Sequence, residues 1–241
     1  MTTNSKPVLR NHVLMSTRPD AQSFITERLQ TRAVTAGETL FDHGDPIHHA
    51  IFPQSGVISM LSQSEGGKSV EQASIGNEGF LGFTYLMGGG SVPARAMVQI
   101  SGEASWLTIA DLEEAMTRFV CVRAALLRYS QALIIQLMET IACNGLHSAE
   151  QRIASWLLLA DRRMQGRTFA LTQDGLGRAL GLRRATVSNI CSDLQRAGAI
   201  TYSRGHLAVV DRAGLRNHAC SCHDRIEAGM IVPGVRDTLP I

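Results

Sequence analysis

The chain lacks the features that mark secreted, membrane-spanning and disulfide-stabilised proteins. Its 241 residues contain no run of about 18 or more uncharged apolar residues, which argues against a transmembrane helix and a membrane partner. The N-terminal sequence lacks the apolar core of a signal peptide. The five cysteines are odd in number and scattered, which argues against a disulfide framework. We therefore expect a cytoplasmic protein with free thiols.

Motifs of the common enzyme classes are also missing. The sequence has no phosphate-binding glycine loop, no Ser/His/Asp order typical of a hydrolase and no helix with metal-ligand spacing. Between residues 32 and 109 there is no sign of the helical crossovers that a βαβ enzyme needs. We therefore expect a protein that is not an enzyme and has no catalytic residues.

Lysine is absent from the C-terminal part of the chain, and charge is unevenly distributed. Residues 1–146 carry ten basic and 13 acidic side chains, whereas residues 147–241 carry 13 arginines and eight acidic side chains. A basic C-terminal part joined to a slightly acidic N-terminal part is typical of a separate nucleic-acid-binding module. Chance fluctuation of a few charges is the alternative explanation.

The periodicity of the apolar residues changes along the chain. Residues 1–20 are polar and irregular, which predicts a loose arm, and residues 21–30 predict a short amphipathic helix. Over residues 32–109, short apolar runs alternate with glycine-containing turns, a pattern typical of an antiparallel β sandwich or barrel. Residues 119–144 contain neither proline nor glycine and predict one long helix.

The predicted long helix carries apolar residues at the three- and four-residue spacing of a coiled-coil seam. A second copy of the chain would bury this seam in a twofold dimer. The alternative is a long core helix in a monomer. The predicted interface residues are Val122, Leu126, Tyr129, Leu133, Leu137 and Thr140.

Residues 171–200 predict two short helices joined by a glycine turn. Thr172 is a suitable N-cap for the first helix. Gly181 can adopt the left-handed conformation that ends this helix, and the second helix is expected from Arg184 to Ala197. This pattern indicates a helix-turn-helix motif. An ordinary helical hairpin packed in a core is the alternative.

Polar side chains remain outside once the apolar side of the predicted second helix is buried. Arginine can bind guanine, and asparagine adenine, through paired hydrogen bonds at the N-terminal end of such a helix. A hairpin wing is expected over residues 200–210, with an arginine at its turn near the DNA backbone. The predicted DNA-contacting residues are Thr172, Gln173, Arg183, Arg184, Thr186, Ser188, Asn189 and Arg204.

The order of a β-rich domain, a long helix and a winged helix-turn-helix resembles the Crp/Fnr family of bacterial transcription regulators. The motifs that carry the resemblance are IGNEGFLG (75–82), QRIASWLL (151–158) and LTQDGLGRALGLRRATVSNI (171–190). The resemblance implies an α+β fold. The implied division is an N-terminal arm (1–21), a cyclic-nucleotide-binding-type β-roll (22–110), a long dimerisation helix (111–146), a winged helix-turn-helix domain (147–216) and a C-terminal tail (217–241).

The same resemblance implies partners and base-contacting positions. Double-stranded DNA with a palindromic operator, a second copy of the chain and RNA polymerase are the implied partners. Arg184 and Asn189 match family positions that contact bases. Ala185 replaces the acidic residue that the family has between them, so the preferred DNA sequence need not be the usual one.

The ligands known in the family do not carry over. Members that bind cyclic AMP have a Gly-Glu pair and an Arg-Ser-Ala run, but here Gly82 is followed by Phe83, and the second motif is Val92-Pro93-Ala94. Members with an iron–sulfur cluster have N-terminal cysteines, but none precedes Cys121. We expect neither cofactor, and the effector stays unassigned. The candidate effector-pocket residues are Asn77, Glu78, Phe83, Arg95, Leu137 and Met138.

Two thiols and an imidazole near the C-terminus are weak candidates for a metal or redox site. Cys220, Cys222 and His223 have soft ligand atoms, but the Cys-x-Cys spacing is tighter than the usual Cys-x₂-Cys of zinc sites. Exposed tail cysteines without a role are the simpler interpretation, and we predict no metal site. Cys121 and Cys143 on the long helix are expected to be small core residues.

Two functions from different classes remain open. A DNA-binding regulator is favoured by the helix-turn-helix pattern and the basic C-terminal part. The alternative is a ligand-binding sensor module whose C-terminal domain contacts protein.

Overall fold

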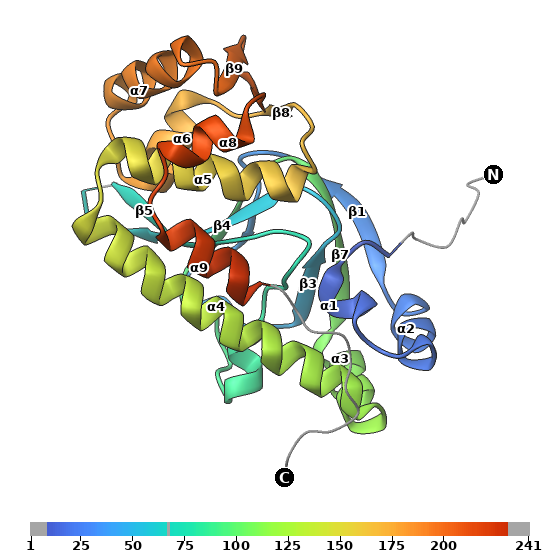
Figure 1. Cartoon of the computed structure of the whole chain (residues 1–241). Helices are drawn as coiled ribbons and strands as arrows, with labels where there is room; N and C mark the ends of the chain where they lie inside the picture. Colours follow the sequence, from blue (N-terminus) through green and yellow to red (C-terminus); the bar gives the residue numbers. More distant parts are fainter. Residues whose placement is uncertain (1–8, 67, 231–241) are drawn as a thin grey trace, which may run out of the picture.

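The N-terminal segment is anchored to the protein rather than loose. The computed structural model describes residues 9–66 and 68–230, and it begins with helices α1 (His12–Met15) and α2 (Pro19–Thr26) (Figure 1). The side chain of Asn11 caps α1 and donates hydrogen bonds to the carbonyl oxygens of Pro53, at 2.9 Å, and Gly79, at 2.7 Å. The prediction of a loose arm is therefore wrong over residues 11–20, because these buried bonds hold α1 to the sheet.

Antiparallel strands form the β-roll that follows. One sheet has the order β1 (Gln30–Val34), β7 (Gly102–Thr108), β3 (His49–Pro53). The second has the order β2 (Thr39–Phe41), β6 (Arg95–Ile100), β4 (Val57–Gln63), β5 (Ser69–Ile75). A short 3₁₀ helix, η1 (Phe83–Met87), lies between β5 and β6 in the chain. The predicted antiparallel β domain is confirmed.

The tight turn between β3 and β4 depends on Gly56. Its φ is +84°, and a Cβ atom at this position would lie 2.6 Å from the carbonyl oxygen of Ile100. Any other residue would therefore be strained and would collide with β6. Behind this turn the two sheets enclose a core in which Phe52 and Phe80 stack with ring centroids 5.4 Å apart.

The long helix predicted over residues 119–144 is confirmed, but the wider helical range 111–146 is divided into two helices. Helix α3 (Ile109–Arg118) is capped by Thr108, and helix α4 (Val120–Leu146) follows it. Phe119 separates them in an extended conformation, with φ −129° and ψ 101°, and its ring packs 5.5 Å from that of Phe24. Because Phe119 is buried in the β-roll core, the chain turns there, and the predicted helix over 111–146 is not continuous.

The predicted dimer seam on α4 faces the chain's own β-roll. Val122, Leu126, Tyr129 and Leu133 are buried in the β-roll core, Leu137 packs partly against it, and Thr140 is half-buried. The ring of Tyr129 lies 5.3 Å from that of Phe80. The four buried side chains are therefore wrongly predicted as interface residues, because the β-roll already covers them.

A different apolar row on α4 is exposed. Its members include four residues at exact seven-residue spacing, and the row consists of Val120, Leu127, Ile134, Met138 and Ile141. We call this row the outer seam. By length and composition alone α4 could cross a membrane. Half of its most apolar window is buried inside the protein, as in the core helix of a globular protein.

The C-terminal domain begins at α5 (Ala149–Met164), where Ser148 and Gln151 form a capping box. The later elements are β8 (Phe169–Ala170), α6 (Gln173–Leu180), α7 (Arg184–Arg196), β9 (Ile200–Ser203), β10 (His206–Val209), α8 (Arg212–Asn217) and α9 (Cys222–Gly229). Figure 1 shows α9 lying alongside α4, and the two helices are in contact. The predicted tail over 217–241 is therefore structured through Met230, because α9 has its own packing partners.

Polar contacts, most of them buried, join the β-roll to the C-terminal domain. The Arg163 guanidinium of α5 lies 2.8 Å from the Glu78 carboxylate, and both side chains are almost fully buried. Trp156 donates its indole N–H to the carboxylate of Glu71 on β5, at 3.0 Å. Ser69, also on β5, donates a hydrogen bond to the carbonyl oxygen of Arg178 on α6.

Candidate nucleic-acid interface

Helix α6 has the caps that the sequence predicts. The hydroxyl of Thr172 accepts a hydrogen bond from the backbone N–H of Gly175 at 3.0 Å. Gly181 ends the helix with φ +64° in the left-handed region. A Cβ atom at Gly177 would lie 2.9 Å from the carbonyl oxygen of Leu182, so the turn to α7 packs tightly against this glycine. The first helix and the turn of the motif are confirmed.

Helix α7 buries Val187, Cys191 and Leu194 against the domain core. Cys191 is fully buried in this core, whereas its neighbour Ile190 is only partly buried against it. At its N-terminal end the polar residues point outward. Arg183, Arg184 and Asn189 are exposed, and Thr186 and Ser188 are half-buried.

The wing is a two-residue hairpin. Its turn residues, Arg204 and Gly205, have φ of +50° and +78°, as expected for a type I′ turn. Strand β8, which the sequence analysis missed, pairs with β10 as a third strand, and Leu171 donates its N–H to the carbonyl oxygen of Gly205 at 2.8 Å. The exposed Arg204 is therefore presented on a rigid turn.

The arginines of this surface differ in whether their charge is neutralised. Arg178 is paired with Asp174 and Arg196 with Asp193. Within residues 9–66 and 68–230, Arg183, Arg184 and Arg204 have no such acidic partner. Figure 1 shows α7 and the wing at one end of the molecule, far from α3. Unpaired positive charge at an exposed end is suited to binding phosphate and base edges.

Thr172 and Gln173 lie at the N-terminus of α6, where the helix dipole is positive. Thr172 is exposed and Gln173 is half-buried. The hydroxyl oxygen of Thr172 already caps the helix, so it has a structural role in addition to any contact with a ligand. Both residues therefore lie at the correct end of α6 for a phosphate contact.

The candidate effector-pocket residues have internal partners or lie apart. The backbone carbonyl oxygen of Asn77 accepts a hydrogen bond from the backbone N–H of His12 at 2.7 Å. Arg95 forms an ion pair with Asp42 at 2.5 Å. Phe83 is buried in the β-roll core, and Leu137 packs partly against that core. Met138 is 65% exposed on the outer seam, so its placement in the pocket is wrong, since it points away from the β-roll.

Glu78 is held by an arginine of the same chain. Burial raises the pKa of its carboxyl, but the charge and hydrogen bonds of Arg163 outweigh this effect, so the pKa is lowered from 4.5. The ionised carboxylate and the guanidinium satisfy each other. Glu78 therefore links two domains, a role that sequence reasoning did not identify.

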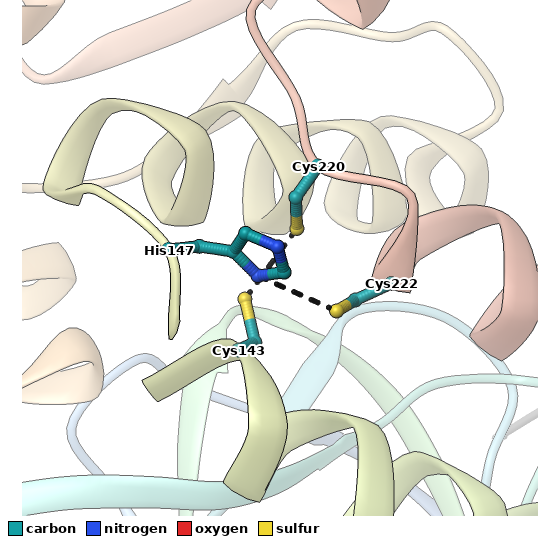
Figure 2. Close-up of side chains that lie close together, drawn as sticks. All are labelled: Cys143, His147, Cys220 and Cys222. Atoms are coloured by element: carbon teal, nitrogen blue, oxygen red, sulfur yellow. Dashed lines mark hydrogen bonds between the residues drawn. The ribbon is translucent and has the colours of Figure 1, made fainter. Parts of the chain in front are cut away.

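The C-terminal cysteines are buried, contrary to the sequence prediction. Cys220 is 5% and Cys222 1% exposed, and they face Cys143 and His147 rather than His223 (Figure 2). The hydrogen bond shared with Cys143 lowers the pKa of the Cys220 thiol. The spacing of Cys143 and His147, one helical turn apart, was the signal available in the sequence.

The fold and this surface define a class: helix-turn-helix transcription regulators with a cyclic-nucleotide-binding-type domain. Residues 31–119 match the model of the cyclic nucleotide-binding domain, and residues 151–218 match that of the Crp-like helix-turn-helix domain. The chain belongs to the Crp/Fnr family.

Named relatives and solved structures are similar over most of the chain. The transcriptional activator protein anr of Pseudomonas aeruginosa is 23% identical over 193 residues, covering 75% of this chain and 76% of that protein. FnrA of Stutzerimonas stutzeri, also a transcriptional activator, is 24% identical over 196 residues, covering 76% and 78%. FixK2 from Bradyrhizobium japonicum has the same fold, with a TM-score of 0.68, 21% identity, and 80% and 98% coverage.

Proposed function

We propose that this protein is a homodimeric, sequence-specific DNA-binding regulator whose α7 enters the major groove. The observation that carries the proposal is the N-terminal end of α7, where Arg183, Arg184 and Asn189 are exposed and neither arginine is neutralised by an acidic partner in the described chain. Arg184 and Asn189 are suited to paired hydrogen bonds with guanine and adenine. Arg183, Thr172, Gln173 and the wing's Arg204 supply phosphate contacts, which fix the position of α7.

Dimerisation through the outer seam follows from its spacing. Val120, Leu127, Ile134 and Ile141 recur every seven residues, which is the repeat of a two-stranded coiled coil. Two copies related by a twofold axis would bury this row and present two α7 helices to the DNA. The operator is therefore proposed to be palindromic, with half-sites about one helical turn apart.

The β-roll is proposed as the regulatory domain, and its effector stays unassigned. Glu78 is bound to Arg163, so it is not available to a ligand in this arrangement. The absence of the Gly-Glu and Arg-Ser-Ala motifs further supports an effector other than cyclic AMP.

The test compares two arginines of the same helix. Operator sequences are first selected from a random DNA library with the full-length protein, and affinity is then measured by fluorescence anisotropy over a range of salt concentrations. Arg184→Ala is expected to cost about 1–3 kcal/mol on the selected operator and to relax the preference at one base pair. Arg196→Ala is the matched control, because Arg196 lies at the C-terminal end of α7 and is paired with Asp193.

Two outcomes would contradict the proposal. One is affinity that does not fall as salt rises, since phosphate contacts release counterions. The other is an unchanged base preference in Arg184→Ala. Failure to enrich any DNA sequence would favour the alternative in which the C-terminal domain contacts protein.

A further inference from the structure

Four soft ligands from separate segments converge beside the end of α4. Cys143 and His147 lie one turn apart at the C-terminal end of α4, and Cys220 and Cys222 flank the start of α9. One ligand atom from each residue lies within 4.8 Å of all the others. Figure 2 shows the three sulfur atoms surrounding the imidazole ring of His147. A Cys₃His set is among the common donor sets of structural zinc sites.

Two of the distances between these atoms match the edges of a small coordination sphere, and all of them are within 4.8 Å. The sulfur atoms of Cys143 and Cys220 are 3.5 Å apart, and the Cys222 sulfur lies 3.6 Å from Nδ1 of His147. Zinc bonds of about 2.3 Å to sulfur and about 2.0–2.1 Å to nitrogen give tetrahedral edges of about 3.5–3.8 Å. The ligands therefore stand close to the positions that one tetrahedral ion requires.

The short spacing of Cys220 and Cys222 is compatible with this geometry. Ser221 between them has a helical backbone conformation, with φ −66° and ψ −10°, so the chain turns and both sulfurs approach His147. The other two ligands, Cys143 and His147, come from the C-terminal end of α4, so the Cys-x-Cys pair does not have to hold the ion alone. The tight spacing that argued against a metal in the sequence is thus compensated by tertiary structure.

Neighbouring groups stabilise the sulfur atoms from outside the cluster. The hydroxyl of Ser155 lies 3.2 Å from the Cys220 sulfur, and the Arg225 guanidinium lies 3.4 Å from the Cys222 sulfur. Arg225 is in turn fixed by Glu139 on α4. Hydrogen bonds of this kind orient thiolate ligands and balance their charge around a metal ion.

We propose that Cys143, His147, Cys220 and Cys222 bind a single Zn²⁺ ion. The ion ties α9 to the junction of α4 and α5, which is where the chain passes from the outer-seam helix into the DNA-binding domain. Its ligands come from segments about 75 residues apart, so binding closes a long loop and stabilises the folded arrangement of the two domains.

The first measurement is the metal content of the tag-free, full-length protein, purified under anaerobic reducing conditions and loaded with ZnCl₂ before desalting. We expect one zinc per chain. Titration of the metal-free protein with Co²⁺ is expected to produce the visible bands of a tetrahedral thiolate site. Removing zinc with a chelator is expected to lower the melting temperature, because the metal binds the folded state.

Matched variants assign the ligands. Cys143→Ser and Cys222→Ser are expected to lose the zinc and the cobalt bands, whereas Cys121→Ser, the same change on the same helix, retains both. Circular dichroism checks that each variant is folded. If a ligand variant does not fold, the cobalt spectrum of the unmodified chain still decides whether a thiolate site is present.

Several results would overturn the proposal. These are a folded protein with far less than one zinc per chain, cobalt bands that survive in both ligand variants, and absorption of an iron–sulfur chromophore after anaerobic purification. A Cys143–Cys220 disulfide in the anaerobic protein, detected by mass spectrometry without reduction, would also overturn it and assign these thiols to a redox pair instead.

Discussion

Arg163→Met is expected to destabilise the protein strongly, because it leaves a buried carboxylate without its partner. The guanidinium donates to Glu78 at 3.0 and 2.8 Å, and to the hydroxyl and carbonyl oxygens of Ser74, both at 2.7 Å. The side chains of Arg163 and Glu78 are only 3% and 6% exposed, so water cannot replace the lost bonds. Methionine fills much of the same volume and makes none of them.

The expected loss of stability follows from the burial of the pair. Removing one member of a buried ion pair costs about 3–5 kcal/mol, a large part of a typical stability of about 5–15 kcal/mol. Adding Glu78→Gln to Arg163→Met removes the stranded charge, so the double variant is expected to recover most of the loss. The double-mutant cycle then gives the coupling energy between the two side chains.

The pH dependence has opposite signs in the two proteins. In the wild type the pKa of Glu78 is below its unfolded value of 4.5, so the pair's contribution is complete above pH 4.5 and is lost as pH falls through the lower folded pKa. In Arg163→Met burial remains the largest influence on the pKa of Glu78, opposed only by the weaker backbone hydrogen bonds of Gly76 and Glu78, so the folded pKa is expected to rise. The variant is therefore expected to gain stability relative to wild type as pH is lowered.

Urea unfolding followed by tryptophan fluorescence measures both effects. Trp106 lies in β7 of the β-roll and Trp156 in α5, so Trp106→Phe leaves a probe in the C-terminal domain. The stabilising role of the buried pair is refuted if Arg163→Met costs less than about 1 kcal/mol, the size of an exposed pair. It is refuted equally if Glu78→Gln fails to restore stability to the Arg163→Met protein.

Three further predictions concern other parts of the molecule. Ile134→Glu on the outer seam is expected to give a folded monomer in analytical ultracentrifugation, whereas Leu133→Glu, one residue away but buried, is expected to unfold the β-roll. A wild-type protein that is monomeric at all concentrations would contradict dimerisation through the outer seam. Gly177→Ala is expected to cost about 1–3 kcal/mol in thermal unfolding, because its Cβ would collide with the Leu182 carbonyl, and no loss would contradict the close approach. Burial raises the pKa of Glu71 above its unfolded value of 4.5, so the contribution of this carboxyl to stability is present below pH 4.5 and is lost as pH rises through the folded pKa. The melting temperature of Glu71→Gln is therefore expected to increase relative to that of wild type as pH rises from 4.5 through the folded pKa. Melting temperatures that change in parallel with pH in the two proteins would contradict the raised pKa.

The helix-turn-helix could be predicted from the sequence because its determinants are local. The Thr172 cap, the left-handed Gly181 and the Arg204-Gly205 turn each depend on neighbours within a few residues. Backbone preferences and short-range hydrogen bonds decide such features, so they can be recognised without knowing the rest of the fold. The structure confirms these elements and adds the small strand β8.

The faces of α4 could not be assigned from the sequence. The buried row through Leu126 and Leu133 and the outer seam through Leu127 and Ile134 are both apolar and differ by one position. Periodicity alone gives no reason to prefer one row, since the difference lies in which row the β-roll covers. Tertiary contacts also decided the positions of Asn11 and of the cysteines, whose partners are far away in the chain.

Strand β5 and the loop after it are the part of the β-roll through which the helix-turn-helix domain is positioned. Ser69 holds α6, Glu71 holds Trp156 of α5, and Ser74 with Glu78 holds Arg163. Gln136 of α4 also donates to the carbonyl oxygen of Ser74, so the helix with the outer seam meets the same strand. A ligand that shifted β5 would therefore have to rearrange buried bonds to α4 and α5 together with the exposed bond to α6. Such bonds favour discrete arrangements over gradual movement, as a regulator that changes its DNA affinity requires.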